Sequence, residues 1–350
     1  MRTLIMTRKI VVITLILIFC TNTLFAQIGN SQTITKTGTT AAAFLKIAPD
    51  PRAAAMGNAF IAIPGDLSSM HWNPAGLDHI TRSEVLFVNN KWLADIDYLF
   101  MAMAVKLPSI GTVGISATSL SIPQDLVRTE IKPDGTGEYW SAQDLSLTLS
   151  ISRRLTDRFS IGGNAKFISE RIWHESSANI ALDFGTLYDM PIGGIRLAGV
   201  LSNYGPKMGL SGRDLYFSSD PDPINSGTVT FVNSEYQTDD YPLPLVFRVG
   251  LSGELFENQK VRLTWAADAL HPNDNLESVN LGAELGLAET VFLRAGWSSL
   301  FLPDTEEGLT LGAGLNYRIG GSQSILKVNY SYSDHGRLKS VQRFSLGLAF

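Results

Sequence analysis

The chain has 350 residues, of which 45% are hydrophobic, with one cysteine and a formal net charge of −5. The acidic balance argues against nucleic acid as a partner, and a single cysteine excludes an intrachain disulfide. Beyond the N-terminus no stretch approaches the ~18 continuous apolar residues of a membrane-spanning helix, which leaves a large soluble β-protein or a transmembrane barrel.

The first 26 residues have the layout of a secretory signal peptide, with three basic residues before an apolar run over 10–19. We expect cleavage after Ala26. The apolar run is shorter than the ~20 residues that a spanning helix needs, so a retained anchor is the weaker alternative. Cys20 could mark a lipoprotein, but the large Phe19 before it argues against lipid attachment.

Residues 27–83 lack the alternation of strands. Residues 27–40 are polar, and we expect a flexible N-terminus there, whereas 41–83 are rich in alanine, glycine and proline. A segment of ~50 residues is too small to be a stable domain alone. We therefore expect residues 41–83 to form a plug inside the barrel predicted for 84–350, whose lumen would otherwise hold water.

Two groups of residues mark the predicted plug. Asp66, followed by two serines, is typical of a helix N-cap or a turn, and Asn73-Pro74-Ala75-Gly76 is a turn signature. The architectural interpretation is that Asp66 caps a short helix and Asn73-Pro74 fixes the last turn before the first strand. The functional alternative is a gate, in which the plug moves when a partner or a hydrophobic solute binds.

Fourteen segments of the remaining sequence alternate between apolar and small or polar residues, with the period of a β-strand. Globular strands average about 5–6 residues, and tilted spanning strands need about 9–11. Most of the segments are 10–13 residues long, which favours spanning strands. The segments are 84–90, 97–107, 110–120, 140–152, 158–170, 176–189, 193–203, 244–254, 259–270, 277–287, 289–298, 307–319, 324–333 and 341–350.

The connections between these segments alternate in length, as do the periplasmic turns and extracellular loops of outer-membrane barrels. The sequence thus predicts an all-β fold, a 14-stranded antiparallel transmembrane β-barrel in the outer membrane, with lipid against its apolar face and a polar lumen. The even count places the mature N-terminal region and the C-terminus together on the periplasmic side.

The final Phe350 resembles the C-terminal signal that outer-membrane assembly reads. Aromatic residues near strand ends are candidates for interface girdles, with ordinary sheet positions as the alternative: Trp92, Tyr98, Trp140, Tyr188, Trp297 and Tyr317.

The loop over 204–243 is far longer than an ordinary connection, which usually marks function or disorder. It is acidic and carries many aromatic residues for a disordered segment. We interpret it as an ordered extracellular cap with a hairpin around 228–233, and a disordered loop is the alternative. Its candidate partner-binding residues are Tyr216, Phe217, Phe231, Tyr236 and Tyr241.

The run FLKIAPDPRAAAMGNAF, followed later by DLSSMHWNPAGL, resembles the PorV/PorQ family of outer-membrane proteins, which is related to the long-chain fatty-acid transporters. The stretches 47–50 and 69–74 look closer to PorV than to PorQ, although Gly76 stands where a PorV-like lysine is expected. The specific match covers about 40 residues. The motif residues of the plug are Pro51, Arg52, Met56, Gly57, Asp66, Trp72, Asn73 and Pro74.

The resemblance implies a 14-stranded barrel plugged by its N-terminus and a role in type IX protein secretion. Proteins of this kind receive the C-terminal signal domain of exported cargo and carry it to the surface attachment machinery. Partners would then be secreted cargo and other secretion proteins, besides membrane lipid. The alternatives are a transporter of long-chain fatty acids or other hydrophobic solutes, and a structural barrel of unassigned role. A transporter should have an apolar pocket at the end of the barrel that carries the long loops, and a lateral opening in the barrel wall.

No motif of an enzyme, metal site or cofactor site is recognisable. The five histidines are scattered, without a second ligand at metal-binding spacing. The glycine pair Gly312 and Gly314 lies inside a strand, where it would ease strand curvature or let the plug pack closely. We therefore expect no enzymatic activity and no cofactor.

Overall fold

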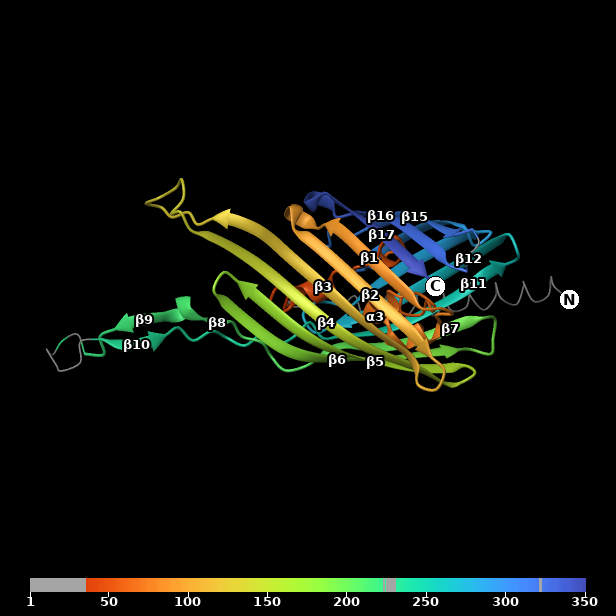
Figure 1. The fold of residues 1–350 in the computed structure, drawn as a ribbon, viewed down its shortest axis with the longest axis horizontal. Helices are drawn as coiled ribbons and strands as arrows, with labels where there is room; N and C mark the ends of the chain where they lie inside the picture. The colour runs from red at the N-terminus through yellow and green to blue at the C-terminus, as the bar shows by residue number, and fades with distance from the viewer. Residues whose placement is uncertain (1–35, 223, 225–230, 321–322) are drawn as a thin grey trace.

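The described chain forms a closed β-barrel. The computed structural model describes residues 36–222, 224, 231–320 and 323–350. The predicted signal peptide, 1–26, and most of the predicted flexible segment therefore lie outside the described residues. Fourteen antiparallel strands of the described chain pair in one ring, which β5 and β6 close (Figure 1). No helix in these residues is long and apolar enough to cross a bilayer.

All fourteen predicted strands are present, and most of their ends agree within a few residues. The largest difference is at β3 and β4, which continue as a hairpin beyond the rim to the pairs Asp125–Trp140 and Leu126–Tyr139. The strands are β1 (Glu84–Lys91), β2 (Asp97–Leu107), β3 (Gly111–Leu126), β4 (Tyr139–Thr156), β5 (Phe159–Ile172), β6 (Glu175–Asp189), β7 (Ile195–Tyr204), β11 (Val246–Glu257), β12 (Val261–Pro272), β13 (Ser278–Leu287), β14 (Val291–Leu300), β15 (Leu309–Arg318), β16 (Ile325–Asp334) and β17 (Ser340–Ala349).

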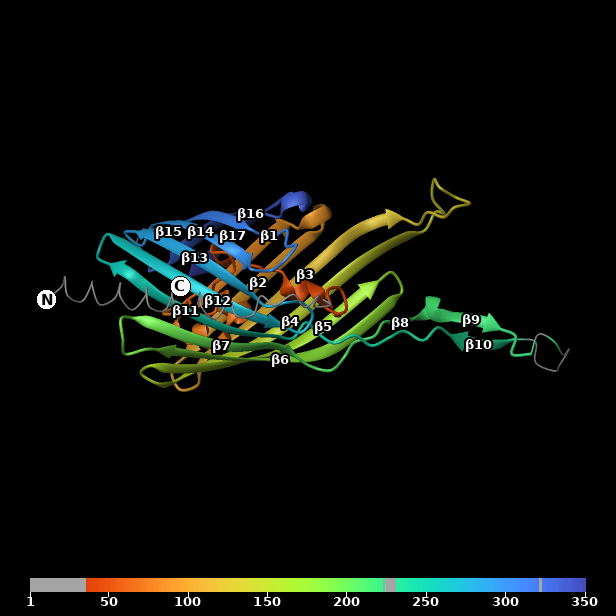
Figure 2. The same ribbon diagram turned by 180° about the vertical axis from the view of Figure 1, so that it is seen from behind.

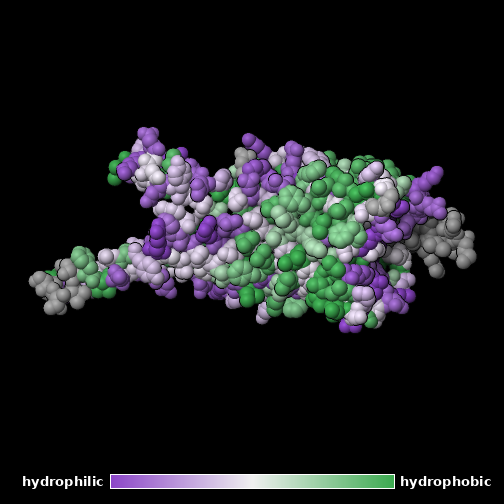
Figure 3. All heavy atoms as spheres, viewed as in Figure 1, coloured by the Kyte–Doolittle hydropathy of each residue, from purple (hydrophilic) through white to green (hydrophobic). Residues whose placement is uncertain are grey.

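The two faces of the barrel differ in polarity as the alternation predicts. On β4 the leucines at 147 and 149 are exposed, whereas the intervening Ser146, Thr148 and Ser150 are buried. Figure 3 shows apolar residues gathered in a band over the barrel, with hydrophilic residues toward both ends. An apolar outer band is what a bilayer requires of a barrel's surface.

Residues 41–83, here called the N-terminal segment, lie inside the ring (Figure 2). The segment contains four short helices, which are η1 (Ala43–Lys46), α2 (Pro51–Ala55), α3 (Ser69–Trp72) and η2 (Pro74–His79). Its apolar residues are almost completely buried and cluster with inward side chains of the wall, such as Leu187 and Val200. Burial of this apolar surface holds the segment in the lumen.

Two expectations from the sequence are wrong in detail. Tyr98 is no interface residue: it faces inward with Phe100 and packs against Leu67 and Met70 of the N-terminal segment. The lumen beside β1 and β2 is therefore apolar, because the segment, and not water, occupies it. Trp92 packs at the edge of the same cluster.

The direction of the N-terminal segment is the second correction. Thr40 contacts Asp274 beyond β12, and the Ala41 amide donates to Pro242 O, so the segment starts at the end of the barrel with the long loops. It then descends to the short-turn end, where Lys106 donates to Asp78 O. The end of the segment and the start of β1 lie beside the C-terminus, where the Phe350 amide donates to Ser83 O and Glu84 pairs with Ala349.

Glycines on the inner wall allow the N-terminal segment to touch the sheet directly. At six of them an added methyl carbon would lie within 2.5 Å of an atom of the segment. Gly282 and Gly296 face the backbone at Met56 and Gly57, and Gly312 faces Ala55 of α2. Only glycine permits an approach this close. The six are Gly162, Gly185, Gly250, Gly282, Gly296 and Gly312.

Neighbouring glycines of β5 provide a matched test of this packing. The Cβ of Gly162→Ala would overlap the backbone of Pro74 and Ala75, whereas that of Gly163→Ala, on the other face, would meet only Asp183 O at 3.5 Å. We expect G162A to lower the free energy of unfolding by about 1–3 kcal/mol, the usual cost of overpacking, and G163A to have little effect. Denaturant unfolding in detergent measures both, and equal values would contradict direct packing.

Candidate functional site

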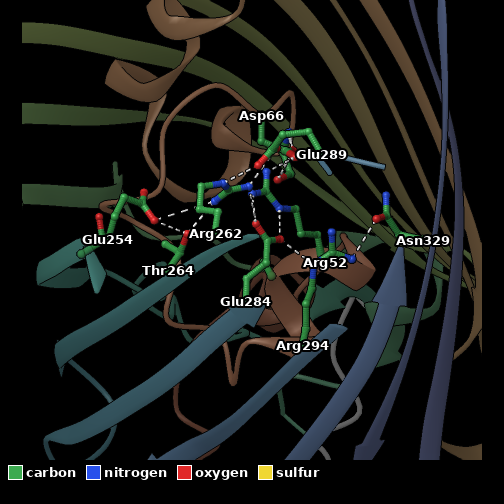
Figure 4. A network of polar contacts seen from close by, with 12 residues as sticks. Arg52, Asp66, Glu254, Arg262, Thr264, Glu284, Glu289, Arg294 and Asn329 are labelled. Carbon is green, nitrogen blue, oxygen red and sulfur yellow. Dashed lines mark hydrogen bonds and ion pairs between the residues drawn. The ribbon is translucent and has the colours of Figure 1, made fainter. Parts of the chain in front are cut away.

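The N-terminal segment is bound to the wall by a buried ionic network centred on Arg52 and Glu284 (Figure 4). Asp50 caps α2 by accepting from the Ala53 amide, and Pro51 occupies the first helical turn, where its missing N–H costs nothing. Arg52 is thereby aimed at β13. Its Nε and Nη2 each donate to a Glu284 oxygen at 2.8 Å, and its Nη1 donates to Asp66 at 2.9 Å.

Glu284 is fully buried and contacts three arginines. Besides Arg52, it accepts from Arg294 at 2.7 Å and from Arg262 at 3.3 Å. Arg262 extends the network by donating to Glu289 of the short-turn end. Three guanidinium groups offset the high cost of burying one carboxylate. The predicted motif residue Arg52 thus has its main partner on the wall, 232 residues away in sequence.

Two carboxyl groups of the segment have shifted pKa values in opposite directions. Burial alone would raise the pKa of Asp66, but the Arg52 guanidinium, Lys327 and the Ser68 hydroxyl together lower it to about 2. Burial, reinforced by the charge of Asp66, raises the pKa of Asp50 to about 7. Asp66 is therefore the ionised partner of Arg52 at neutral pH.

The remaining motif residues contact other parts of the wall. The Gly57 amide donates to Thr310 Oγ1 at 2.9 Å, beside the buried Met56. Asn73 accepts from the Ala75 amide and donates to Ile61 O and to Thr186 O of β6, while Pro74 lies against Gly185. Trp72 packs near Phe60, with the guanidinium of Arg248 5.7 Å from its ring. Asp66 is not the N-cap of α3, which is Ser68. Its carboxylate accepts from the Ser68 amide in a turn, the other form expected from the sequence, and from Arg52.

The sequence reasoning missed the wall residues that receive the segment. Asp268 of β12 accepts from the Phe60 and Ile61 amides at 2.7 and 3.0 Å, and Glu284 and Arg294 complete the ionic network. The available signal is a charged residue at an inward strand position, where its neighbours are glycine, serine or threonine. In the described residues no cluster of three metal-binding side chains is present.

The long loop between β7 and β11 carries a hairpin that projects far beyond the barrel rim (Figure 1). β8 (Ser211–Gly212) pairs with β6, η4 (Arg213–Leu215) follows, and β9 (Tyr216–Ser219) pairs with β10 (Val232–Glu235). Residues 228–230 of the hairpin expected around 228–233 lie outside the described residues, and Val232 and Asn233 belong to β10. We call β9 and β10 the aromatic hairpin.

The five candidate aromatic residues of this loop are all exposed, and Phe231 is 69% exposed. Phe217 and Tyr236 stack across the aromatic hairpin with ring centroids 4.4 Å apart. At its base, His174 contacts Asp214 at 2.6 Å and Arg213 at 2.6 Å. An isolated two-stranded hairpin with exposed aromatic rings is marginally stable in water and suited to binding a partner.

Breaking the ionic network from one side should be costly. We expect Arg52→Met to lower the free energy of unfolding by about 3–5 kcal/mol, because Glu284 and Asp66 then stay buried with too little positive charge. The control Arg128→Met removes an exposed pair with Asp125 and should cost less than about 1 kcal/mol. Denaturant titration followed by tryptophan fluorescence compares them, and a similar cost for both variants would argue against the network.

The ionised Asp66 should also make the free energy of unfolding fall at acid pH. A carboxyl whose folded pKa is lowered stabilises the fold above its ordinary value of 3.8, and this contribution is lost as pH falls toward about 2. The wild type should exceed Asp66→Asn by about 2 kcal/mol near neutral pH and match it near pH 2. Unfolding curves at several pH values test this, and a difference that does not depend on pH would refute it.

Comparisons with known proteins agree with this architecture. The sequence model of the family "Type IX secretion system protein PorV" matches residues 30–189. No match was found among curated protein sequences. Similar solved structures include the CymD monoaromatic hydrocarbon channel, with a TM-score of 0.53 and 10% identity, covering 87% of this chain and 98% of that chain. The Pseudomonas putida toluene transporter TodX has a TM-score of 0.52 and 11% identity, covering 85% and 96%.

A FadL homologue of Pseudomonas aeruginosa has a TM-score of 0.50 and 11% identity, covering 87% of this chain and 97% of that chain. At such low identity these structures establish the fold alone. The family match falls on the N-terminal segment and on the first six strands, and it includes every residue of the motif noticed in the sequence. The chain is therefore an outer-membrane β-barrel that is similar to the PorV family over residues 30–189.

Proposed function

We propose that this barrel is a non-enzymatic component of type IX protein secretion. It binds the C-terminal signal domain of exported cargo at its extracellular loops and carries it to the surface attachment machinery. The match to the PorV family supports the secretion role. The observation that carries the binding role is the aromatic hairpin, because exposed rings on a projecting strand pair form a surface for a protein partner.

In this proposal each segment of the chain has its own role. Residues 1–26 direct export and are removed, 41–83 plug the lumen, and 84–350 form the barrel that holds the long loop at the cell surface. The short-turn end then faces the periplasm. In this proposal the motif residues from Pro51 to Pro74 keep the lumen closed, while the loop 204–243 meets the partner.

The alternative is a transporter of long-chain fatty acids or other hydrophobic solutes. The fold shared with hydrocarbon channels is compatible with it. However, the N-terminal segment fills the mid-lumen of the described structure, and the cavities near the long loops include several charged side chains, such as Lys46 and Asp274. This lining is less apolar than the pocket expected of a transporter, which favours the secretion role.

A pulldown with hairpin variants tests the proposal. Tagged protein is purified from its own outer membranes in mild detergent, and co-purifying proteins are identified by mass spectrometry. We expect large secreted proteins that share a C-terminal β-domain, and we expect Tyr216→Ser, Phe217→Ser and Tyr236→Ser combined to reduce their recovery at least about tenfold, as loss of central aromatic contacts does.

The control is Tyr139→Ser, which removes an exposed aromatic ring from the other projecting hairpin, β3–β4. It should leave recovery of the secreted proteins unchanged. Recovery of fatty acid or another apolar solute, with no protein partner, would overturn the secretion role in favour of transport.

A further inference from the structure

A cavity of about 430 Å³ lies between the N-terminal segment and the long-loop end of the barrel. Phe44 and Ile47 of the segment line one side of it, and its rim includes Trp92, Glu307 and His335 from three different loops. The volume falls within the range of small-ligand sites, and the rim residues lie in loops at the same end of the barrel as the long loop between β7 and β11.

The wall of this cavity holds a buried cation, Arg343 of β17, which is only 3% exposed. Its Nε donates to Ala48 O at 3.2 Å, one Nη donates to Ser333 Oγ at 3.0 Å, and the guanidinium carbon lies 5.1 Å from the centre of the Trp92 ring. No carboxylate of the described chain lies within ion-pair distance of it. A buried charge without a counter-ion within ion-pair distance is costly, so this position favours an anion.

Other charged groups at the cavity already have partners. Lys46 pairs with Asp274 at 2.6 Å, and Glu307 accepts from Ser299 Oγ at 2.7 Å. Arg343 is therefore the cation left to receive a ligand.

Buried polar groups without partners flank Arg343. Asn90 and Ser331 lie directly opposite it on the two neighbouring strands, β1 and β16, and both face inward. Within the described residues, both amide atoms of Asn90, the hydroxyl of Ser331 and Nε2 of His335 have no hydrogen-bond partner. Buried polar groups are nearly always paired in native structures, so these atoms favour a polar partner beside the cation. Of the three residues, His335 lines the cavity itself.

The other side of the cavity carries two acidic side chains. Asp144 of β4 and Glu170 of β5 are direct cross-strand neighbours, and both line the cavity. Glu170 accepts from the Ala42 amide, and no cation of the described chain pairs with either carboxylate. The apolar side chains of Phe44, Ile47 and Leu120 also line the cavity. The cavity thus offers a cation on one wall and two carboxylates on another.

We propose that this cavity binds the carboxyl-terminal end of a polypeptide that has a basic side chain close to that end. The terminal carboxylate pairs with Arg343, and the basic side chain pairs with Asp144 and Glu170. A simple fatty carboxylate would satisfy Arg343 alone and leave the two carboxylates without a counter-ion. The inference rests on the proposed function, since exported cargo supplies the polypeptide end.

Calorimetric titration of the purified full-length barrel in detergent tests the site. The probe is the dipeptide acetyl-Lys-Phe with a free carboxylate, compared with its carboxamide and with acetyl-norleucyl-Phe. We expect the carboxamide and the norleucine peptide each to bind at least about tenfold more weakly, because each leaves a buried charge unpaired. Equal affinity for the free acid and its carboxamide, or for the lysine and norleucine peptides, would overturn the assignment.

Variants of the chain identify the binding groups. Arg343→Met should lose at least about tenfold in affinity, Arg343→Lys should keep part of it, and Asp144→Asn should abolish the preference for lysine over norleucine. Arg318→Met, at an exposed position, is the control. If Arg343→Met does not fold, two measurements still decide whether Arg343 binds the peptide carboxylate. These are the affinity of Arg343→Lys and the comparison of the free acid with the carboxamide on the wild type.

Titration with octanoate distinguishes a fatty acid from a peptide terminus as the source of the bound carboxylate. Octanoate binding as tight as that of the free-acid peptide, and unaffected by Asp144→Asn, would overturn the peptide assignment. Failure of the peptide titration while the pulldown still recovers secreted proteins would remove this inference and leave the proposed function standing. Failure of both would remove the function as well.

Discussion

Backbone hydrogen bonding in a bilayer is the constraint on which the rest of this structure depends. An open sheet edge in lipid would leave N–H and C=O groups unpaired, so the fourteen strands must close, and β5 pairs with β6 to do so. A closed ring of this size has an interior too wide for wall side chains to fill. The N-terminal segment occupies that interior, and most other features of the chain follow from fitting a folded segment against the inside of a sheet.

Two kinds of contact accomplish this fit. Inner glycines such as Gly282 and Gly296 let the backbone of the segment touch the backbone of the wall, and fully buried charges such as Glu284 and Asp268 accept its donors. Buried ion pairs add little net stability compared with apolar packing, but removing one partner is costly. The network therefore fixes one position of the segment more than it strengthens the fold. A segment that left the lumen would have to break all of these contacts together.

The sequence predicted the strands well because the membrane imposes strict alternation and a minimum strand length, as in β4, where apolar residues alternate with serine and threonine. It predicted the importance of Arg52 only through the family resemblance, and that of Asn73 through a turn signature as well. Their partners, Glu284 and Thr186, are far away in sequence, and no local pattern reveals such pairs. Tyr98 was misassigned because an aromatic residue near a strand end looks the same whether it faces lipid or a packed lumen.

Site-specific photo-crosslinking in living cells tests the central claim, that the projecting loop receives exported protein. A photoreactive phenylalanine analogue is placed at Phe217 of the aromatic hairpin and, as a control, at Leu149 on the outer face of β4. The account predicts that position 217 forms adducts with secreted proteins carrying a common C-terminal β-domain, and that position 149 does not. Secretion that proceeds normally without any protein adduct at position 217 would contradict it.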